Sequence, residues 1–423
     1  MKKKLLSAVL SAAMLVSVFT NFVFAAAEST DIEIRTAAEL AALADRDITG
    51  AIELLCDIDM ADTEMSPIAS LNGDFDGNGY TISNLSISEN TTDDTTHTAL
   101  ISTLNGTVRD TVFENPNVSL NYNKSYGGSY VSAAVIAGYA DGGEANFINC
   151  AIIGDNANVT FTTKNANQGC GAFLGYANNT AVTIENCYST ADVSCYGYRG
   201  GLIGVVGYSS ADIKNSAVVG NVSAASSYYG AGGGMIGNVL GPSSTVNFTN
   251  CFYGGTLTGS KKYGFAYITG KYSYPTVTAQ NCYYDSTKNK SSSSYTPFEV
   301  FPSATPTVGN AEGKETGEIT AALLGSAFTD NGDYPVTAWY PALDEAAEHN
   351  LTVTVYPENA EVTLLDEART AVSGEKSENV YTYNALNGKY TCTVGGVQGY
   401  EEKTFTVNTG KVSDMSRKVT LAE

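Results

Sequence analysis

The chain repeats two landmarks, an apolar block bracketed by glycine or alanine and a strand-like run that ends in asparagine. The blocks span residues 134–138, 171–175, 201–204 and 234–237, and a degenerate fifth copy begins at Gly264. Successive runs are separated by 37, 29, 35 and 31 residues and end at Asn149, Asn186, Asn215, Asn250 and Asn281. Landmarks that persist at varying intervals are typical of a solenoid with loop insertions.

The segments between these landmarks cluster β-branched and apolar residues and lack the helical period of 3.6 residues. Each coil is therefore expected to contribute short strands that pair with the coils above and below at about 4.8 Å. Identical side chains at one place in every coil then stack, and asparagine amides hydrogen-bond along such a column. We expect an all-β chain built around a parallel β-helix, with the five asparagines as a structural ladder.

Cysteines occupy the position after the ladder asparagine in four of the five repeats. They are Cys150, Cys187, Cys251 and Cys282. The chain has eight cysteines, and an even number in an exported chain suggests disulfides. The shared register instead favours a stack of small buried side chains, and both interpretations stay open. Zinc is not expected, because there is no Cys-x-x-Cys motif and there are only two histidines.

The repeat blocks also carry a known motif. Gly201-Leu202-Ile203-Gly204 reads as GLUG, where U is an apolar residue, and the block at Gly234 differs by a methionine. Residues 75–87 and 325–339 are similar to the opening and closing segments of the same proteins. The chain thus resembles GLUG-motif bacterial surface proteins over most of its length. That resemblance implies a right-handed parallel β-helix and export, and it implies no particular reaction.

Residues 1–27 have the order of a signal peptide, with a basic start, an apolar middle and a small-residue end. Removing its three lysines leaves 20 basic and 44 acidic residues, a formal charge of −24. This acid excess repels nucleic acids and anionic membranes, so neither is an expected partner. No later apolar run is long enough to span a membrane. We expect an extracellular protein, secreted or associated with the cell surface.

Three regions follow the signal peptide. The β-helix is expected over 28–342, with an N-terminal cap at about 32–48 that contains a capping box from Thr36 to Glu39. Its closing segment is expected at about 310–342, with a short helix over 318–324 covering the end of the solenoid, and 287–307 reads as an exposed excursion.

Clean alternation of polar and apolar residues then marks a second domain over 350–423. Six short strands in this span predict a small antiparallel β-sandwich, with a tight hairpin turn at Asn387-Gly388. It resembles Ig-like modules of the PEGA or carboxypeptidase-regulatory type. The resemblance implies a spacer or a binding accessory.

One segment resembles the start of a calcium loop. Asp74, Asp76 and Asn78 match its first positions, but the twelfth place holds Leu85 where a bidentate glutamate belongs. A glycine turn whose Asp and Asn side chains bond their own backbone explains the same residues. Calcium is therefore only an alternative here, and no other cofactor is expected.

Tyrosines gather in the variable stretches that precede the glycine blocks. The candidate ligand-binding residues are Tyr196, Tyr198, Arg199, Tyr228 and Tyr229. An aromatic strip beside polar side chains holds sugar rings by apolar contact and hydrogen bonds. Stacked tyrosines also stabilise sheets without any ligand, so the strip has a purely structural interpretation as well.

Three functional hypotheses remain. The first is a non-catalytic protein that acts in adhesion by binding a glycan or a surface protein through the β-helix. The second is a polysaccharide lyase or hydrolase of the β-helix type, for which Asp192 and Asp212 are the acids to examine. The third is a structural spacer of the cell surface. No catalytic residue is assigned by the sequence.

Overall fold

The computed structural model describes thirteen stretches of the chain. They are residues 32–124, 130–163, 168–224, 231–259, 262–269, 275–289, 297–300, 307–308, 311–342, 349–366, 368–386, 389–408 and 415–422. The predicted signal peptide and the predicted hairpin turn at Asn387-Gly388 lie outside them.

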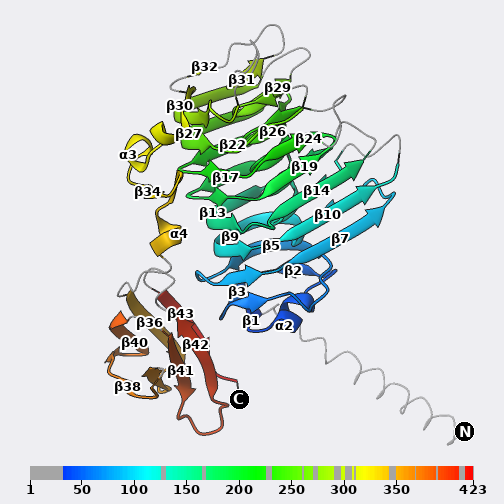
Figure 1. Cartoon of the computed structure of the whole chain (residues 1–423). Coiled ribbons are helices and arrows are strands. Elements are labelled where there is room, and N and C mark those ends of the chain that lie inside the picture. The colour runs from blue at the N-terminus through cyan, green and yellow to red at the C-terminus, as the bar shows by residue number, and fades with distance from the viewer. Residues whose placement is uncertain are drawn as a thin grey trace, which may run out of the picture.

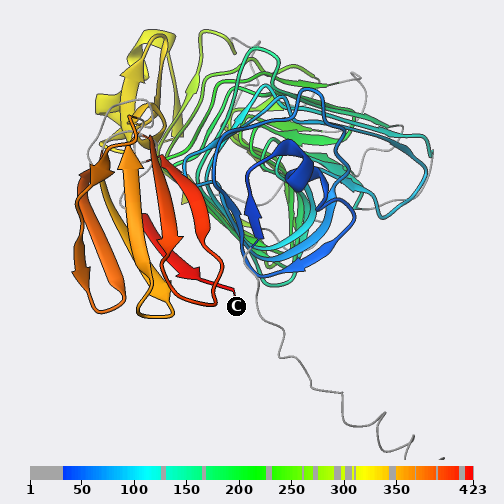
Figure 2. The same ribbon diagram turned by 90° about the horizontal axis from the view of Figure 1, so that it is seen from below.

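A right-handed parallel β-solenoid of about six turns forms most of the molecule, as predicted. Figure 1 shows its coils stacked one on another from β1 (Ile32–Ile34) to β31 (Phe298–Val300). Looking along the stack, Figure 2 shows each coil as a closed loop. Every pairing between the coils is parallel among the described strands, so each residue lies directly over its counterpart in the coil below.

The strands of the solenoid fall into three sets. The largest, with 22 strands, contains β1, β2 (Asp47–Thr49), β3 (Ile52–Leu54), β4 (Ile58–Asp59), β5 (Ile68–Asp76), β6 (Thr81–Ser83), β9 (Ile101–Glu114), β12 (Ala137–Asp141), β13 (Glu144–Ile153), β16 (Leu174–Asn178), β17 (Ala181–Glu185), β18 (Tyr188–Ser189), β21 (Ile203–Gly207), β22 (Ser210–Lys214), β23 (Ala217–Val218), β26 (Ile236–Leu240), β27 (Thr245–Tyr253), β29 (Ala266–Thr269), β30 (Thr276–Asp285), β31, β32 (Thr307–Val308) and β33 (Ala311–Lys314). The second contains β7 (Ser86–Thr91), β10 (Asn117–Tyr122), β14 (Asn158–Thr163), β19 (Asp192–Cys195) and β24 (Val222–Ala224). The third contains β8 (His97–Thr98), β11 (Ser132–Ala133), β15 (Gly169–Cys170), β20 (Tyr198–Gly200), β25 (Gly232–Gly233) and β28 (Lys262–Tyr263).

Columns of apolar side chains fill the interior of the coils. One column runs through the middle strands of successive coils and comprises Phe75, Val108, Phe147, Ile184, Ile213 and Phe248. All six are buried in the main hydrophobic cluster. Because every coil adds one such layer, burial of apolar surface continues along the whole axis.

The five predicted ladder asparagines form one hydrogen-bonded column. Each Nδ2 donates to the Oδ1 of the residue below it at 2.8–3.1 Å, and the lowest acceptor is Asp110. All five asparagines and Asp110 have left-handed backbones, with φ between 49° and 54°. Asparagine and aspartate tolerate this conformation better than other residues that carry a side chain. Asparagine therefore both adopts the left-handed backbone at the bend and supplies the amide that forms the ladder.

The cysteines beside the ladder point into the interior. Cys251 and Cys282 are register partners, and all eight cysteines are free thiols. Burial raises the pKa of the Cys150 and Cys251 thiols, and the neighbouring thiols Cys187 and Cys282 raise it further. In the structure these residues are small buried side chains in a stack.

The N-terminal cap is the short helix α2 (Ala37–Ala41). The Thr36 hydroxyl accepts a hydrogen bond from the Glu39 backbone N–H, and the Glu39 carboxylate accepts one from the Arg35 N–H. Half of the predicted capping box is therefore present, because the Glu39 carboxylate accepts from the residue before the N-cap and not from Thr36 itself.

The closing segment differs from its prediction. It comprises the 3-10 helix η1 (Thr316–Glu318), α3 (Ala321–Leu324), the hairpin β34 (Phe328–Asn331) and β35 (Tyr334–Thr337), and α4 (Trp339–Ala342). The predicted helix over 318–324 is shorter because Thr320 caps α3 from outside. The segment also descends along the flank of the solenoid rather than covering its end (Figures 1 and 2). We call residues 315–342 the flank strap.

The predicted excursion over 287–307 contains strands of the solenoid. β31 pairs with β29, and β32 pairs with β30, so the chain returns to add a further partial coil. Phe298 is buried in the core of that coil. The surrounding sequence is rich in serine, so the pattern of residues did not predict that Phe298 would be buried.

The C-terminal region packs two four-stranded sheets around a separate hydrophobic cluster. The first contains β36 (His349–Tyr356), β39 (Glu375–Ser377), β40 (Val380–Leu386) and β43 (Met415–Thr420). The second contains β37 (Glu361–Asp366), β38 (Ala371–Val372), β41 (Lys389–Gly395) and β42 (Lys403–Asn408). The sandwich is not purely antiparallel, because β43 pairs with β36 in parallel.

This sandwich lies beside the first coils of the solenoid (Figures 1 and 2). Leu55, which follows β3, is 2% exposed and belongs to the hydrophobic cluster of the sandwich. Lys403 of β42 forms an ion pair with Glu33 of β1 at 3.2 Å. The two regions are therefore joined by both an apolar and a charged contact.

Candidate functional site

A row of aromatic side chains lies along one side of the solenoid, where the short strands of the third set lead into the main sheet. We call it the aromatic strip. Its described members are His97, Tyr130, Tyr139, Tyr176, Tyr198, Tyr208, Tyr263 and Tyr267. They come from coils between β8 and β29, and the coil that contains β26 contributes none of them.

The N-terminal half of the strip is a continuous ring cluster. The His97 ring stacks on Tyr139 with 4.4 Å between centroids, and Tyr139 lies 6.1 Å from Tyr176. Tyr130 places its edge against Tyr176 at 5.2 Å. Tyr130 is 42% exposed and Tyr208 is 50% exposed, so the cluster offers ring surface to the solvent.

The C-terminal half consists of three stacked tyrosines. Tyr263 and Tyr267 stack at 5.5 Å, and Tyr198 stacks on Tyr267 at 6.4 Å. The coil between them contributes Ala231 and Gly232, whose small size leaves room for rings from the coils on either side. Burial raises the pKa of Tyr176 between the two halves, and the nearby hydroxyls of Tyr198 and Tyr208 raise it further.

The register of the coils explains how these rings line up. Tyr139, Tyr176, Val205 and Asn238 are Cα partners in consecutive coils, and each directly follows a glycine that ends a repeat block. The next residue in each strand faces the core. Since side chains alternate along a strand, the residue after the glycine points away from the core in every coil. Tyr176, Val205 and Asn238 are nevertheless covered by other residues, with at most 5% of each exposed.

In two adjacent coils a polar side chain follows the ring at an offset of two residues. The Asn178 amide donates to the Asp141 carboxylate at 2.9 Å, and the two are Cα partners on the same outer face as Tyr139 and Tyr176. In a later coil, Thr269 donates to Asn238 Oδ1 at 3.0 Å. Asn238 Nδ2 is buried and has no hydrogen-bond partner among the residues that the structure describes.

The histidine and tyrosine rings of the strip carry no charge of their own at neutral pH. Burial lowers the pKa of His97 to about 4, so its imidazole is neutral. Burial, helped by the nearby Asp141 carboxylate, raises the pKa of Tyr139 to about 12. Two carboxylates lie beside the strip among the described side chains, Asp141 near Tyr139 and Asp93 near His97.

The structure treats the predicted ligand-binding residues in three ways. Tyr198 belongs to the strip, Tyr196 is half-buried next to it in sequence, and Tyr228 and Tyr229 lie outside the described residues. Arg199 does not fit the prediction, because its side chain is wholly buried. It donates to the carbonyls of Gly197 and Thr258 inside the coil. Alternation along β20 turns Arg199 inward when Tyr198 points outward.

Most members of the strip were not predicted from the sequence. The predicted residues lie in the stretches before the glycine blocks, whereas Tyr139 and Tyr176 come directly after one. A tyrosine directly after the last glycine of a block is the sequence pattern that would have predicted these two residues.

The calcium-like residues form a turn. The Asp76 carboxylate accepts the backbone N–H of Asn78 at 2.8 Å and pairs with Arg109 at 2.7 Å. Asn78 donates to the Leu54 carbonyl, while Asp74 is exposed. These are the contacts of the glycine-turn alternative. Within the described stretches, no three His, Cys, Asp or Glu side chains are grouped closely enough to hold a metal ion.

The two acids considered for catalysis are held apart. Asp192 lies in β19 and accepts two hydrogen bonds from Asn221. Asp212 lies in β22 of the main sheet and pairs with Lys214 at 2.7 Å. The structure does not bring them together.

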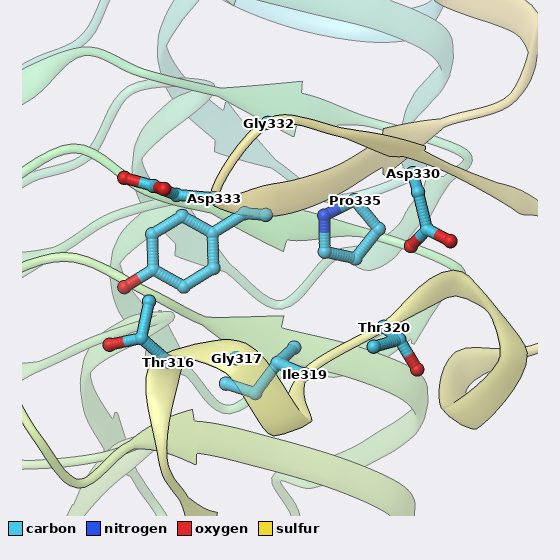
Figure 3. A pocket seen from close by; sticks show the side chains of 9 residues that line it. Thr316, Gly317, Ile319, Thr320, Asp330, Gly332, Asp333 and Pro335 are labelled. Carbon is cyan, nitrogen blue, oxygen red and sulfur yellow. The ribbon is translucent and has the colours of Figure 1, made fainter.

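A cavity of about 290 Å³ lies within the flank strap, between the β34–β35 hairpin and the segment from η1 to α3 (Figure 3). Its walls include Tyr334, Asp330 and Asp333. Below it, Thr316 and Tyr334 donate to the buried carboxylate of Asp285. Burial opposes ionisation of Asp285, but these bonds and backbone N–H donors outweigh it and lower the pKa. The hydroxyls of Thr316 and Tyr334 therefore donate to a structural carboxylate rather than into the cavity.

No helix among the described residues is long and apolar enough to cross a membrane.

Comparison with known proteins gives one structural similarity. No family model matches the chain, and no curated protein matches its sequence. A crystal structure from Bacteroides ovatus, of a protein provisionally named immunoglobulin A1 protease, aligns with a TM-score of 0.53. The alignment covers 74% of this chain and 93% of that chain at 20% identity. At this identity the similarity concerns the fold, and it agrees with a β-helix as the body of the molecule.

Proposed function

We propose that this chain is an exported, non-catalytic bacterial protein, secreted or held at the cell surface, that acts in adhesion by binding glycans through the aromatic strip. The observation that carries the proposal is a ring beside a polar side chain in each of two adjacent coils, next to the exposed ring of Tyr130. Tyr139 with Asp141 and Tyr176 with Asn178 repeat the same pair in register.

This pairing suits carbohydrates for a simple reason. A pyranose has apolar C–H faces and a polar rim of hydroxyls, so it fits an aromatic ring beside hydrogen-bonding side chains. The exposed rings of Tyr130 and Tyr208 provide the contact area. The GLUG-type repeats and the PEGA-like sandwich support a role at the cell surface, in which the sandwich positions the solenoid.

The test is a glycan array followed by calorimetry on the positive glycans. Tyr130→Ala and Tyr208→Ala should each weaken binding by about tenfold, the usual cost of removing one aromatic anchor. Tyr356→Ala is the matched control, because Tyr356 is an exposed tyrosine, 38% accessible, on the sandwich. It should bind like the wild type.

Two results would contradict the proposal. If no glycan binds, or if loss of Tyr130 and Tyr208 changes nothing, the strip is a sheet stabiliser and the chain a spacer or a protein binder. Turnover of a polysaccharide would instead favour the lyase or hydrolase hypothesis. In that case Asp192→Asn and Asp212→Asn identify whether either acid takes part.

A further inference from the structure

The N-terminal end of the solenoid is only partly covered by its cap. The helix α2 lies over the opening of the first coils, and its Leu40 is buried in the main hydrophobic cluster (Figure 2). The second strand set begins later, at β7, and extends past that cap on one side (Figure 1). Among the described strands, β7 and β8 are the first strands of their sheets, with a neighbour on one side only. An edge strand of this kind is where a further strand can pair.

The backbone of β7 has a paired side and an open side. The Asn117 N–H of β10 donates to the Leu85 carbonyl, which sets the phase of the pairing between β10 and β7. Successive residues of a strand direct their N–H and C=O groups to opposite sides, so every second residue of β7 faces away from β10. No described strand pairs with that side. The residues that face it are Ser86, Ser88 and Asn90.

The inward-facing column that ends at β7 changes its chemistry at this strand. In the coils above, the column is apolar, and Leu120, Phe161 and Cys195 are successive Cα partners with 0% exposure. The Cα partner of Leu120 in β7 is Glu89. The Glu89 carboxylate accepts a hydrogen bond from the buried hydroxyl of Thr98 in β8. A polar pair therefore joins the two edge strands where an apolar layer would otherwise continue.

We propose that Glu89 prevents β7 from pairing with a second copy of this chain. This inference is independent of the proposed glycan binding. In the symmetric antiparallel pairing centred on Ser88, the open N–H and C=O groups of the two β7 strands meet. Glu89 of each copy then lies opposite Ile87 of the other copy, on the core side of the strands, where Ile87 is 1% exposed. Pairing therefore buries a carboxylate against an apolar side chain.

Burial of this carboxylate is costly because no cation accompanies it. Among the ion pairs of the described residues, none includes Glu89. The hydrogen bond from Thr98 satisfies part of the carboxylate and leaves its charge uncompensated. In the single chain Glu89 is partly exposed, so the carboxylate keeps water that it would lose on pairing. An inward-pointing charge on an edge strand opposes edge-to-edge association for this reason.

The experiment measures molar mass over a concentration series, by light scattering after size-exclusion chromatography, on the chain from Glu28 onward. We expect the wild type to stay monomeric. Glu89→Leu extends the apolar column to the edge and should raise the association constant about a hundredfold or more, because the buried charge is gone. Glu89→Ala removes the charge without adding apolar surface, so its association constant should lie between those of the wild type and the leucine variant.

Two further variants locate the contact. Glu185→Leu makes the same exchange on the outward face of β17, within the sheet, and should stay monomeric. Ser88→Pro, added to Glu89→Leu, removes a backbone N–H that faces the open side and that the pairing with β10 does not use. We expect this double variant to return to a monomer. Circular dichroism and melting temperature check that each variant is folded.

The outcomes decide the role of Glu89. A folded Glu89→Leu variant that stays monomeric would overturn the proposal, and so would equal association of Glu185→Leu. Association that persists with Ser88→Pro would place the contact away from β7 and would also overturn it. A wild type that already pairs, and that Ser88→Pro separates, would make β7 a docking edge instead. If Glu89→Leu does not fold, a monomeric Glu89→Ala variant overturns the proposal and an associating one supports it.

Discussion

At the scale of the residue, the asparagine ladder shows how one side chain meets two demands. The chain bends sharply at the same place in every coil, and Asn215 adopts φ of 49° there. Its amide also donates to Asn186 and accepts from Asn250, at 3.1 and 3.0 Å. Glycine would adopt the left-handed backbone but has no amide for the ladder. Glutamine would disfavour that backbone, and its longer side chain would not match the distance between neighbouring amides.

Replacing Asn215 should separate the two contributions. Asn215→Ala removes two hydrogen bonds and strains the left-handed backbone, and we expect it to lower the free energy of unfolding by about 2–4 kcal/mol. Asn215→Gly removes the same bonds without the strain, so it should be more stable than the alanine variant by about 1 kcal/mol. Urea denaturation measures both. Equal stability of the two variants would show that the backbone conformation costs nothing at this position.

At the scale of the element, the flank strap acts as an external brace. Phe328, Tyr334 and their neighbours pack on a column of solenoid side chains that includes Tyr188, Phe252 and Tyr283. The ladder ends against this strap, because Asn281 also donates to the last carbonyls of α3. Further down, the Trp339 indole donates to the carbonyl of Asn186. The strap therefore ties several coils together.

The strap can be followed by fluorescence, because Trp339 is the single tryptophan of the chain. Phe252 is buried against Phe328 and Tyr334 at 6.1 and 5.8 Å. Phe252→Ala should cost about 3–5 kcal/mol and release the strap first, so tryptophan emission shifts at a lower urea concentration than the far-ultraviolet circular dichroism.

The matched control for the strap is Phe248→Ala. Phe248 is an equally buried phenylalanine of the same strand, but it packs on Phe265 and Phe298 inside the coil. Its loss should move both signals together. A coincident shift in the Phe252→Ala variant as well would mean that strap and solenoid unfold as one unit.

At the scale of the whole molecule, the sandwich lies against the first coils of the solenoid through Leu55 and the Glu33–Lys403 ion pair. The Glu33–Lys403 ion pair is partly exposed, so it contributes at most about 1 kcal/mol. Leu55 is buried in the cluster of the sandwich and contributes more, about 2 kcal/mol for one apolar side chain of this size.

Small-angle X-ray scattering tests which contact holds the sandwich in place. Leu55→Asp should let it swing away and increase the maximum dimension of the molecule, because a carboxylate is costly to bury in an apolar contact. Lys403→Ala should leave the scattering unchanged. If Leu55→Asp scatters like the wild type, other contacts fix the arrangement.

The sequence predicted the β-helix, the asparagine and cysteine columns and Thr36 as the helix N-cap, because each is a local or periodic property. Landmarks such as Asn186 and Gly204 reveal the coil period without any knowledge of the loops. It predicted the site less well. Arg199 was placed at the surface although alternation from Tyr198 turns it inward, and the serine-rich stretch around Phe298 concealed a further coil.

What the sequence determined by itself is that successive coils stack in register, since identical residues recur where identical backbone bends are needed. Only the tertiary structure decided which rings meet across coils, that the flank strap runs down the side, and that the sandwich rests on Leu55. Those contacts join residues far apart in the chain, such as Trp339 and Asn186. Their partners follow from the shape of the coils, which no local pattern of residues records.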